Sequence, residues 1–314
     1  MRTARILADQ NQSSAVYHVI SRVVDRQFVL GDEEREQFVR FMRMYARFCG
    51  VEILTYCAMS NHFHLLVEVP SSEGFTLSDE EILERCGHVY SDAALREIRW
   101  KLKELCPSQG EQALAEYRES LLYRMNSLSE FMKTLKQRFT QWFNKKHGRR
   151  GTLWEDRFKS VLVENREGAT DAMAAYIDLN PVRAGMVEDP KDYRWCGYGE
   201  ALGSGNEEAL RGLARVVEAR GASVRVDSSS SREERKREVL ERKGQLRRHE
   251  WLLCRVRYFT DGVVIGSKGF VDGFFEARRE KFGPKRKSGA RKMRYGDFGG
   301  LCSLRDLQVQ VIRS

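Results

Sequence analysis

The chain has 314 residues, enough for one large domain or two ordinary ones with a sizeable core. Its formal net charge of +9 and isoelectric point near 9.2 favour a polyanionic partner, although a merely soluble basic protein has the same balance. No stretch approaches the ~20 continuous apolar residues of a membrane span and no apolar leader opens the chain, so a membrane or secreted protein is not expected. Its seven cysteines form no CxxC pair, which predicts reduced, mostly inert thiols in the cytoplasm.

The predicted elements before residue 200 alternate between strands and helices. After a loose leader, the order is strand, helix, strand, strand, helix, strand, helix, with a tight turn at 59–61 making the second and third strands a hairpin. Three charged helical stretches between the third strand and the second helix predict an insertion over about 71–126. The predicted strands are 15–24, 51–58, 61–69 and 157–163, and the helices are 33–49, 127–146 and 168–180.

The first six elements predict an α+β fold with the ferredoxin-like split β-α-β order. That fold is an antiparallel four-stranded sheet with both helices on one face. We expect the other face, or a groove beside it, to stay free for a ligand. Residues 1–200 would form this domain, 201–231 a Gly/Ser-rich linker, and 232–314 a mainly helical, basic extension.

Two polar constellations stand out within this pattern. His62 and His64 alternate along a strand, so both point to one face and can ligate one divalent ion. Tyr176 and Asn180 are four apart and share a helical face, with Asn180 at the helix end before Pro181. Each motif has an ordinary interpretation: half-buried histidines without metal, and a core tyrosine with its hydroxyl at the rim. For His18, on the first strand, a core role is favoured.

Basic side chains gather in two parts of the sequence. From residue 133 to 159 there are nine Lys or Arg against two acids, interleaved with the aromatic residues Phe139, Trp142, Phe143, Trp154 and Phe158. Cations neutralise phosphates and exposed rings stack on unpaired bases, so this mixture suits single-stranded nucleic acid. Several of these aromatic residues must also be core, because they recur at helical spacing. The candidate DNA-binding residues are Lys133, Lys136, Arg149, Arg150, Arg157 and Lys159.

The second basic cluster lies in the C-terminal extension. From residue 232 to 294 there are twenty Lys or Arg against nine acids, which favours a small helical DNA-binding module over a packing appendage with a basic surface. Gly266-Ser267-Lys268 precedes a predicted helix and is a candidate phosphate seat at a helix N-terminus. It lacks the GxxxxGK[ST] spacing, so an NTPase is not expected.

Four motifs together resemble a known family. In order they are Tyr17–Arg22, Met59–His64, Gly151–Phe158 and Tyr176–Gly185. They are similar to the single-tyrosine HUH transposases, and most of all to the REP-associated tyrosine transposases, the chromosomal relatives of the IS200-like enzymes. The resemblance covers roughly residues 13–200 without the insertion.

The resemblance implies a role for each site residue. His62 and His64 would bind Mg²⁺ or Mn²⁺, Asn180 would take the place of a third ligand, and Tyr176 would attack single-stranded DNA. The products would be a 5′-phosphotyrosine link and a free 3′-hydroxyl, which reseals the strand when another 3′-hydroxyl attacks. Such enzymes act on hairpins of repeated extragenic palindromes, and other enzymes of this chemistry serve rolling-circle replication or conjugation. The resemblance further implies a cytoplasmic, nucleoid-associated monomer or homodimer and no further cofactor.

Two other functions stay open at this point. A domesticated hairpin-DNA-binding protein or regulator would keep the fold with little or no strand transfer. A metal-dependent phosphoesterase would use activated water and would survive the loss of Tyr176.

Overall fold

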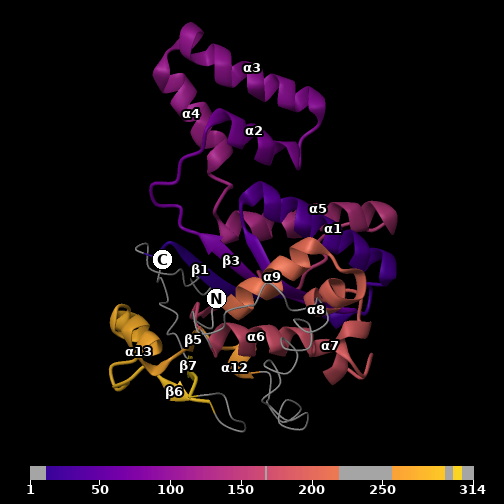
Figure 1. Cartoon of the computed structure of the whole chain (residues 1–314), viewed down its shortest axis with the longest axis vertical. Coiled ribbons are helices and arrows are strands. Elements are labelled where there is room, and N and C mark those ends of the chain that lie inside the picture. Colours follow the sequence, from indigo (N-terminus) through magenta and orange to yellow (C-terminus); the bar gives the residue numbers. More distant parts are fainter. Residues whose placement is uncertain (1–11, 167, 219–256, 294–299, 306–314) are drawn as a thin grey trace, which may run out of the picture.

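The structure, a computed structural model, describes residues 12–166, 168–218, 257–293 and 300–305. Seven strands of these residues form one sheet in the order β2-β3-β1-β4-β5-β7-β6, with helices on both of its faces (Figure 1). Neighbouring strands are antiparallel except for the parallel pair β4 and β5. The strands are β1 (Ser14–Arg22), β2 (Glu52–Ala58), β3 (His62–Pro70), β4 (Lys159–Val163), β5 (Val264–Gly266), β6 (Arg291–Lys292) and β7 (Cys302–Leu304).

The helices fall into three groups along the chain. The core helices are α1 (Asp32–Cys49), α5 (Leu128–Lys146), α6 (Ala169–Asp178), α7 (Asn180–Arg183), α8 (Gly197–Gly199) and α9 (Glu207–Glu218). The inserted helices are α2 (Asp79–Gly87), α3 (Asp92–Gln109) and α4 (Glu111–Leu122), and the C-terminal ones are α12 (Arg257–Thr260) and α13 (Lys268–Glu276). Short turns η1 (Val24–Arg26), η2 (Pro190–Asp192), η3 (Glu200–Ser204) and η4 (Arg279–Lys281) complete the set.

The first four strands confirm the predicted ferredoxin-like core. Their order, β2-β3-β1-β4, and their antiparallel pairing are those of the split β-α-β fold, and α5 takes the place of its second helix. In the β1–β3 register Ile20 lies opposite His64 and Arg22 opposite His62. Residues directly opposite each other share a face, so the histidines project from the same face as His18, Ile20 and Arg22.

Both faces of the sheet are covered, which contradicts the prediction of a free face. Tyr17, Val19, Phe63 and Leu65 pack with α1 and α5 on one side. The residues that alternate with them along β1 and β3, including Val16 and Leu66, pack with α6 and α9 on the other face of the sheet. The central strands β1 and β3 are buried except at their ends, because their apolar residues follow one another without polar alternation. A ligand site on the histidine side must therefore lie between the sheet and α6.

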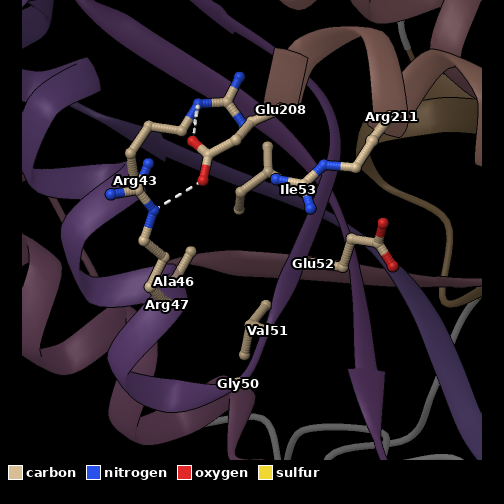
Figure 2. A pocket seen from close by; sticks show the side chains of 9 residues that line it. All are labelled: Arg43, Ala46, Arg47, Gly50, Val51, Glu52, Ile53, Glu208 and Arg211. Atoms are coloured by element: carbon tan, nitrogen blue, oxygen red, sulfur yellow. Dashed lines mark hydrogen bonds and ion pairs between the residues drawn. The ribbon is translucent and has the colours of Figure 1, made fainter. Parts of the chain in front are cut away.

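Helix α9 corrects the predicted linker at 201–231. Ala209, Leu213 and Val216 recur at helical spacing and are buried against the sheet, although the surrounding sequence is rich in Gly, Ser and Glu. Figure 2 shows Glu208 of α9 between Arg43 and Arg47 of α1, with nitrogen–oxygen distances of 3.6 Å and 2.6 Å. An apolar stripe and an ion-pair cluster thus attach this helix to the core. The rest of the predicted linker, from residue 219 on, lies outside the described residues.

Gly212 is the contact point of α9 with β2, and it supports a test of this packing. A Cβ at Gly212 would lie 2.5 Å from the carbonyl oxygens of Ile53 and Leu54. We therefore expect Gly212→Ala to lower the free energy of unfolding by about 1–3 kcal/mol, as overpacking does. Gly273, inside α13, has no atom within 4 Å of a Cβ, so Gly273→Ala should raise stability by about 0.5–1 kcal/mol. Urea unfolding of both variants measures the difference, and equal shifts would contradict the close approach of α9.

The helical insertion projects away from the sheet at the top of Figure 1. It consists of α2, α3 and α4, as the charged helical stretches predict. Ser78 caps α2 by accepting a hydrogen bond from the Glu81 amide, and the Glu81 carboxylate accepts one from the Ser78 amide. Its sequence carries more acidic than basic residues, so the positive charge of the chain lies elsewhere.

The described part of the C-terminal extension, 257–293 and 300–305, is joined to the core sheet. β5 pairs with β4, and β7 and β6 extend the sheet further, beyond what the sequence predicts. The candidate phosphate seat is already filled, because the Glu164 carboxylate accepts from the Ser267 amide at 2.6 Å and from its hydroxyl at 3.0 Å. That internal anion takes the position that a phosphate would need. The predicted helical run at 232–250 lies outside the described residues.

The state of the cysteines and the hydropathy of the helices agree with what the composition predicts. The five cysteines whose side chains are described are buried and free, and they are Cys49, Cys57, Cys86, Cys196 and Cys302. Burial raises the pKa of the Cys49 thiol to about 12, so this thiol is un-ionised and unreactive at neutral pH. Within the described parts of the chain, no helix combines the length and the apolar character needed to cross a membrane.

Candidate metal and nucleophile site

The two predicted metal ligands lie side by side at the start of β3. Their ring centroids are 5.1 Å apart, with His62 half-buried and His64 buried. The Asn61 amide nitrogen donates to the Arg26 carbonyl, so its oxygen faces His62 Nδ1 at 2.7 Å. An amide oxygen only accepts, so His62 Nδ1 carries the proton and its Nε2 keeps a free lone pair.

The local environment keeps these imidazoles neutral. Burial, together with the Arg22 and Arg183 guanidiniums, lowers the pKa of His62 to about 4. Burial lowers the pKa of His64 well below its ordinary value, and the neighbouring histidines and arginines act in the same direction. Neutral imidazole is the form that binds a metal, so no proton has to leave before binding at neutral pH. Because they are neutral, the two histidines are suited to bind a divalent cation.

Helix α6 brings Tyr176 to the histidine face of the sheet. The helix ends at Asp178, whose carboxylate accepts hydrogen bonds from the Thr55 hydroxyl at 2.5 Å and the Tyr198 amide at 3.3 Å. The break at Leu179 starts the short turn α7 with Pro181 in its first positions, where proline is tolerated. Asp178 thus fixes the C-terminal end of α6 to β2, two residues after the candidate nucleophile.

The Tyr176 ring is buried among aromatic rings and one guanidinium. It meets His18 and His64 edge-on at centroid distances of 6.0 Å each, and stacks on Phe259 at 4.5 Å. The Arg183 guanidinium lies over the ring at 4.0 Å from the centroid. Burial raises the pKa of the Tyr176 phenol, while Arg183 partly opposes the shift, so the phenol is un-ionised at neutral pH. The prediction that Tyr176 lies beside the histidine pair agrees with this geometry.

Asn180 is engaged by its own helix turn. Its amide nitrogen donates to the carbonyls of Tyr176 and Ile177, and its oxygen accepts from Arg183 at 2.8 Å. No group of three His, Cys, Asp or Glu side chains suited to a metal forms among the described residues. Among the described residues, the two imidazoles are the candidate ligands at this site, and the Asn180 oxygen already accepts a hydrogen bond from Arg183.

Arg183 supports a prediction on cation affinity. Its charge acts on both histidines and its guanidinium holds the Asn180 oxygen, and both effects oppose a divalent cation. We expect Arg183→Gln to tighten Mn²⁺ binding by about tenfold, since removing a nearby like charge is worth on the order of 1 kcal/mol. Calorimetric titration with Mn²⁺ measures this, with Arg194→Gln, an exposed arginine paired with Glu36, as the control. Weaker binding in Arg183→Gln would mean that the guanidinium supports the cation site.

A comparison with protein-family models matches residues 11–82 to the model described as "Transposase IS200 like". The match confirms the resemblance predicted from the motifs for the segment that contains His18, His62 and His64. Tyr176 and Asn180 lie outside the matched segment, so their roles and the metal ligation stay predictions.

The chain was also compared with solved structures and with curated proteins. A solved structure described as "Structure of the REP associates tyrosine transposase bound to a REP hairpin" is similar with a TM-score of 0.42 and 13% identity. The similarity covers 65% of this chain and 87% of that chain. A search of curated proteins finds no match.

The predicted DNA-binding residues differ in how freely they project. Lys133, Arg150, Arg157 and Lys159 are exposed, although Lys133 pairs with Glu130 at 3.1 Å and Lys159 with Asp261 at 3.8 Å. Lys136 instead donates to the Asp156 carbonyl at 2.7 Å, and Arg149 is half-buried over the Phe143 ring. Both are held against the protein, so the four exposed cations are the better candidates for phosphate contact.

The aromatic residues of the first basic cluster are mostly core. Phe139, Phe143, Trp154 and Phe158 are buried, and only Trp142 is partly exposed. Four of the five predicted rings are therefore unavailable for stacking on bases. The helical spacing that brings them together serves the packing of α5 on α1 and the sheet.

Sequence reasoning missed three residues near the site. Arg183 lies seven positions after Tyr176, which is two helical turns and hence the same side, so the spacing carried a usable signal. Arg22 lies opposite His62 in the sheet, which the predicted strand order implies. Phe259 carried no local signal, because only the tertiary fold brings α12 to α6.

Proposed function

We propose that this protein is a metal-dependent single-strand DNA endonuclease and strand transferase that acts through Tyr176. The observation that carries the proposal is the contact between the Tyr176 and His64 rings, at a centroid distance of 6.0 Å. A phenol and a pair of neutral imidazoles are equipment for covalent phosphodiester cleavage beside a cation. The IS200-like segment supports the same class of reaction.

In the proposed reaction the Tyr176 hydroxyl attacks the scissile phosphorus. The bond between phosphorus and the tyrosine oxygen forms while the bond to the 3′-oxygen breaks. The phenolic proton leaves to solvent, and the departing 3′-oxygen takes up a proton to become a hydroxyl. Attack of a 3′-hydroxyl on the phosphotyrosine reverses these steps and rejoins the strand. Such transfers depend mainly on positioning and charge neutralisation.

His62 and His64 would hold the divalent cation, Mg²⁺ or Mn²⁺, through their Nε2 atoms. When bound there, the cation would neutralise charge on a non-bridging phosphate oxygen. Burial of the Tyr176 ring limits its motion, and Arg183 over that ring favours the phenolate that develops during attack. The chain itself thus supplies orientation of the nucleophile and part of the charge balance.

The substrate we propose is single-stranded or hairpin DNA of the REP type, in line with the family resemblance. The exposed cations Arg150, Arg157 and Lys159 offer contacts to a phosphate backbone. We expect the protein to act in the cytoplasm beside the nucleoid, as a monomer or homodimer. Light scattering of the free protein and of its DNA complex measures the oligomeric state.

A second candidate function is hairpin-DNA binding with little or no strand transfer. A specific observation favours it: the Asn180 oxygen accepts from Arg183, and the described residues form no group of three His, Cys, Asp or Glu suited to a metal. A regulator of this kind would bind the same hairpins through the same cations. The presence or absence of a covalent product separates the two functions.

The deciding experiment is polarity-resolved covalent capture. Hairpin oligonucleotides labelled at either the 5′ or the 3′ end are incubated with the protein and Mn²⁺ or Mg²⁺, then separated on a denaturing gel. Our proposal expects a protein adduct that carries the 3′ label, because the 5′ phosphate of the 3′ fragment is the one joined to tyrosine. The 5′-labelled fragment should run free with a 3′-hydroxyl, and EDTA should remove both products. Binding in native gels without any adduct would favour the second function.

A further inference from the structure

Phe259 makes two separate contacts with the proposed site. It belongs to α12, directly before the strand β5 that extends the sheet, and its side chain is fully buried. Its ring stacks on the Tyr176 ring with 4.5 Å between centroids and 17° between planes. Its main-chain carbonyl oxygen lies 2.8 Å from His18 Nδ1. One residue of the C-terminal extension therefore touches both the candidate nucleophile and the histidine cluster.

The Phe259 carbonyl determines where the protons of the histidine cluster lie. A carbonyl oxygen only accepts, so His18 Nδ1 must carry a proton. A neutral imidazole has one N–H, so His18 Nε2 is an acceptor. It lies 2.9 Å from His64 Nδ1, which must therefore donate. His64 Nε2 is left with its lone pair, matching His62, whose Nδ1 donates to Asn61.

We propose that His18 and Phe259 are positioning residues of the active site. The Phe259 carbonyl, acting through His18, holds His64 in the tautomer whose Nε2 is free for a cation, and the Phe259 ring holds the Tyr176 phenol against the same cluster. The inference rests on the proposed function for its catalytic meaning. It assigns the α12–β5 segment to the active site, instead of to a separate DNA-binding module.

Packing alone does not require this arrangement. His18 is fully buried and His64 is 3% exposed, and both lie on a sheet face where Val16, Leu66 and Val161 are buried beside them. Taking imidazoles out of water costs free energy that apolar side chains of similar volume would not cost. The hydrogen bonds also allow one arrangement of donors only: His64 Nδ1 donates to His18 Nε2, and His18 Nδ1 donates to the Phe259 carbonyl. A metal-ligating histidine characteristically donates its other N–H to such a partner.

The first test reads the tautomers directly in the metal-free protein. Long-range ¹H–¹⁵N correlation spectra of the histidine rings should show His62 and His64 protonated on Nδ1 and unprotonated on Nε2. In His18→Phe, which removes the acceptor but keeps an aromatic ring, His64 should lose this single tautomer. His18→Gln, whose side-chain oxygen can accept, should restore it at least in part. His88→Phe, in the insertion, serves as the matched control and should leave the spectra of His62 and His64 unchanged.

The second test separates the carbonyl of Phe259 from its ring. Phe259→Leu keeps the main-chain carbonyl, so the His64 tautomer and the Mn²⁺ affinity should stay as in the unchanged protein. The rate of covalent adduct formation should fall by about tenfold to a hundredfold, because the nucleophile loses its stacking partner. His18→Phe should instead weaken Mn²⁺ binding by about tenfold to a hundredfold, the usual effect of losing a partner of a metal ligand.

The outcomes distinguish this inference from the proposed function. His64 protonated on Nε2 in the unchanged protein would overturn the tautomer relay, and this measurement needs no variant to fold. Equal Mn²⁺ affinity in His18→Phe and the unchanged protein would also overturn the tautomer relay. An unaltered rate of adduct formation in Phe259→Leu would overturn the positioning role of the Phe259 ring. The predicted tautomers in a protein that forms no adduct would support the relay and overturn the proposed function.

Discussion

Tyr176→Phe is expected to abolish the covalent adduct while leaving DNA binding intact. The loss should be on the order of 10⁴-fold or more, because no other group replaces a missing nucleophile. The substituted ring can still stack on Phe259, and the Tyr176 hydroxyl makes no hydrogen bond with any residue that the structure describes. The free energy of unfolding should therefore change by less than about 1 kcal/mol. Denaturing gels measure the adduct, native gels the binding, and urea unfolding the stability.

Tyr45→Phe is the matched control for this result. Tyr45 is also a buried tyrosine, but it belongs to α1 on the opposite face of the sheet. Adduct formation should continue in this variant at an unaltered rate. DNA cleavage that persists in Tyr176→Phe would instead identify water as the nucleophile and support the phosphoesterase hypothesis.

The second large effect is expected at the histidine pair. His62→Ala should reduce metal-dependent adduct formation by more than about a hundredfold, since it removes one of two imidazole ligands rather than a partner of a ligand. His62 is half-buried at the start of β3, so this variant should fold with little loss of stability. His64→Ala should show the same loss of activity together with lower stability, because it also leaves Nε2 of the buried His18 without a hydrogen-bond donor.

Mn²⁺ titration monitored by electron paramagnetic resonance measures the ligand loss independently of catalysis. His88→Ala, in the insertion, should bind Mn²⁺ as the unchanged protein does. Full adduct formation by His62→Ala in the presence of EDTA would contradict a metal role, and would make the Arg183 guanidinium over the Tyr176 ring the candidate for charge neutralisation.

The sequence predicts those features that depend on neighbours along the chain. The alternation that puts His62 and His64 on one face, and the fourfold spacing of Tyr176 and Asn180, are local properties. The hairpin and the strand order follow from element order and the ferredoxin-like pattern. For this reason the core sheet and the meeting of the tyrosine with the histidines could be predicted.

Features that depend on distant contacts were not accessible in this way. Leu213 and Val216 form an apolar stripe inside a stretch whose Gly, Ser and Glu content is typical of a linker. Only their packing on the apolar face of the sheet explains the helix. Glu164 fills the helix N-terminus at Ser267 because β4 and β5 are neighbours, a parallel pairing with no signal in either segment. The engagement of Asn180 by Arg183 is a choice among hydrogen-bond partners that spacing alone leaves open.

Because Phe259 packs on Tyr176, the proposed site is completed late during synthesis of the chain. Phe259 follows Tyr176 by about 80 residues, and at ~5–20 residues per second a ribosome adds it roughly 4–16 s later. Until then the nascent chain has the histidines and the tyrosine but neither the ring that packs on the phenol nor the carbonyl that His18 needs. A polypeptide released early, before residue 259, would carry the candidate DNA-binding cations of residues 133–159 with an incomplete site. Under the proposed mechanism, competence to cut DNA would thus be acquired late in translation, after most Lys and Arg residues of the chain have been synthesised.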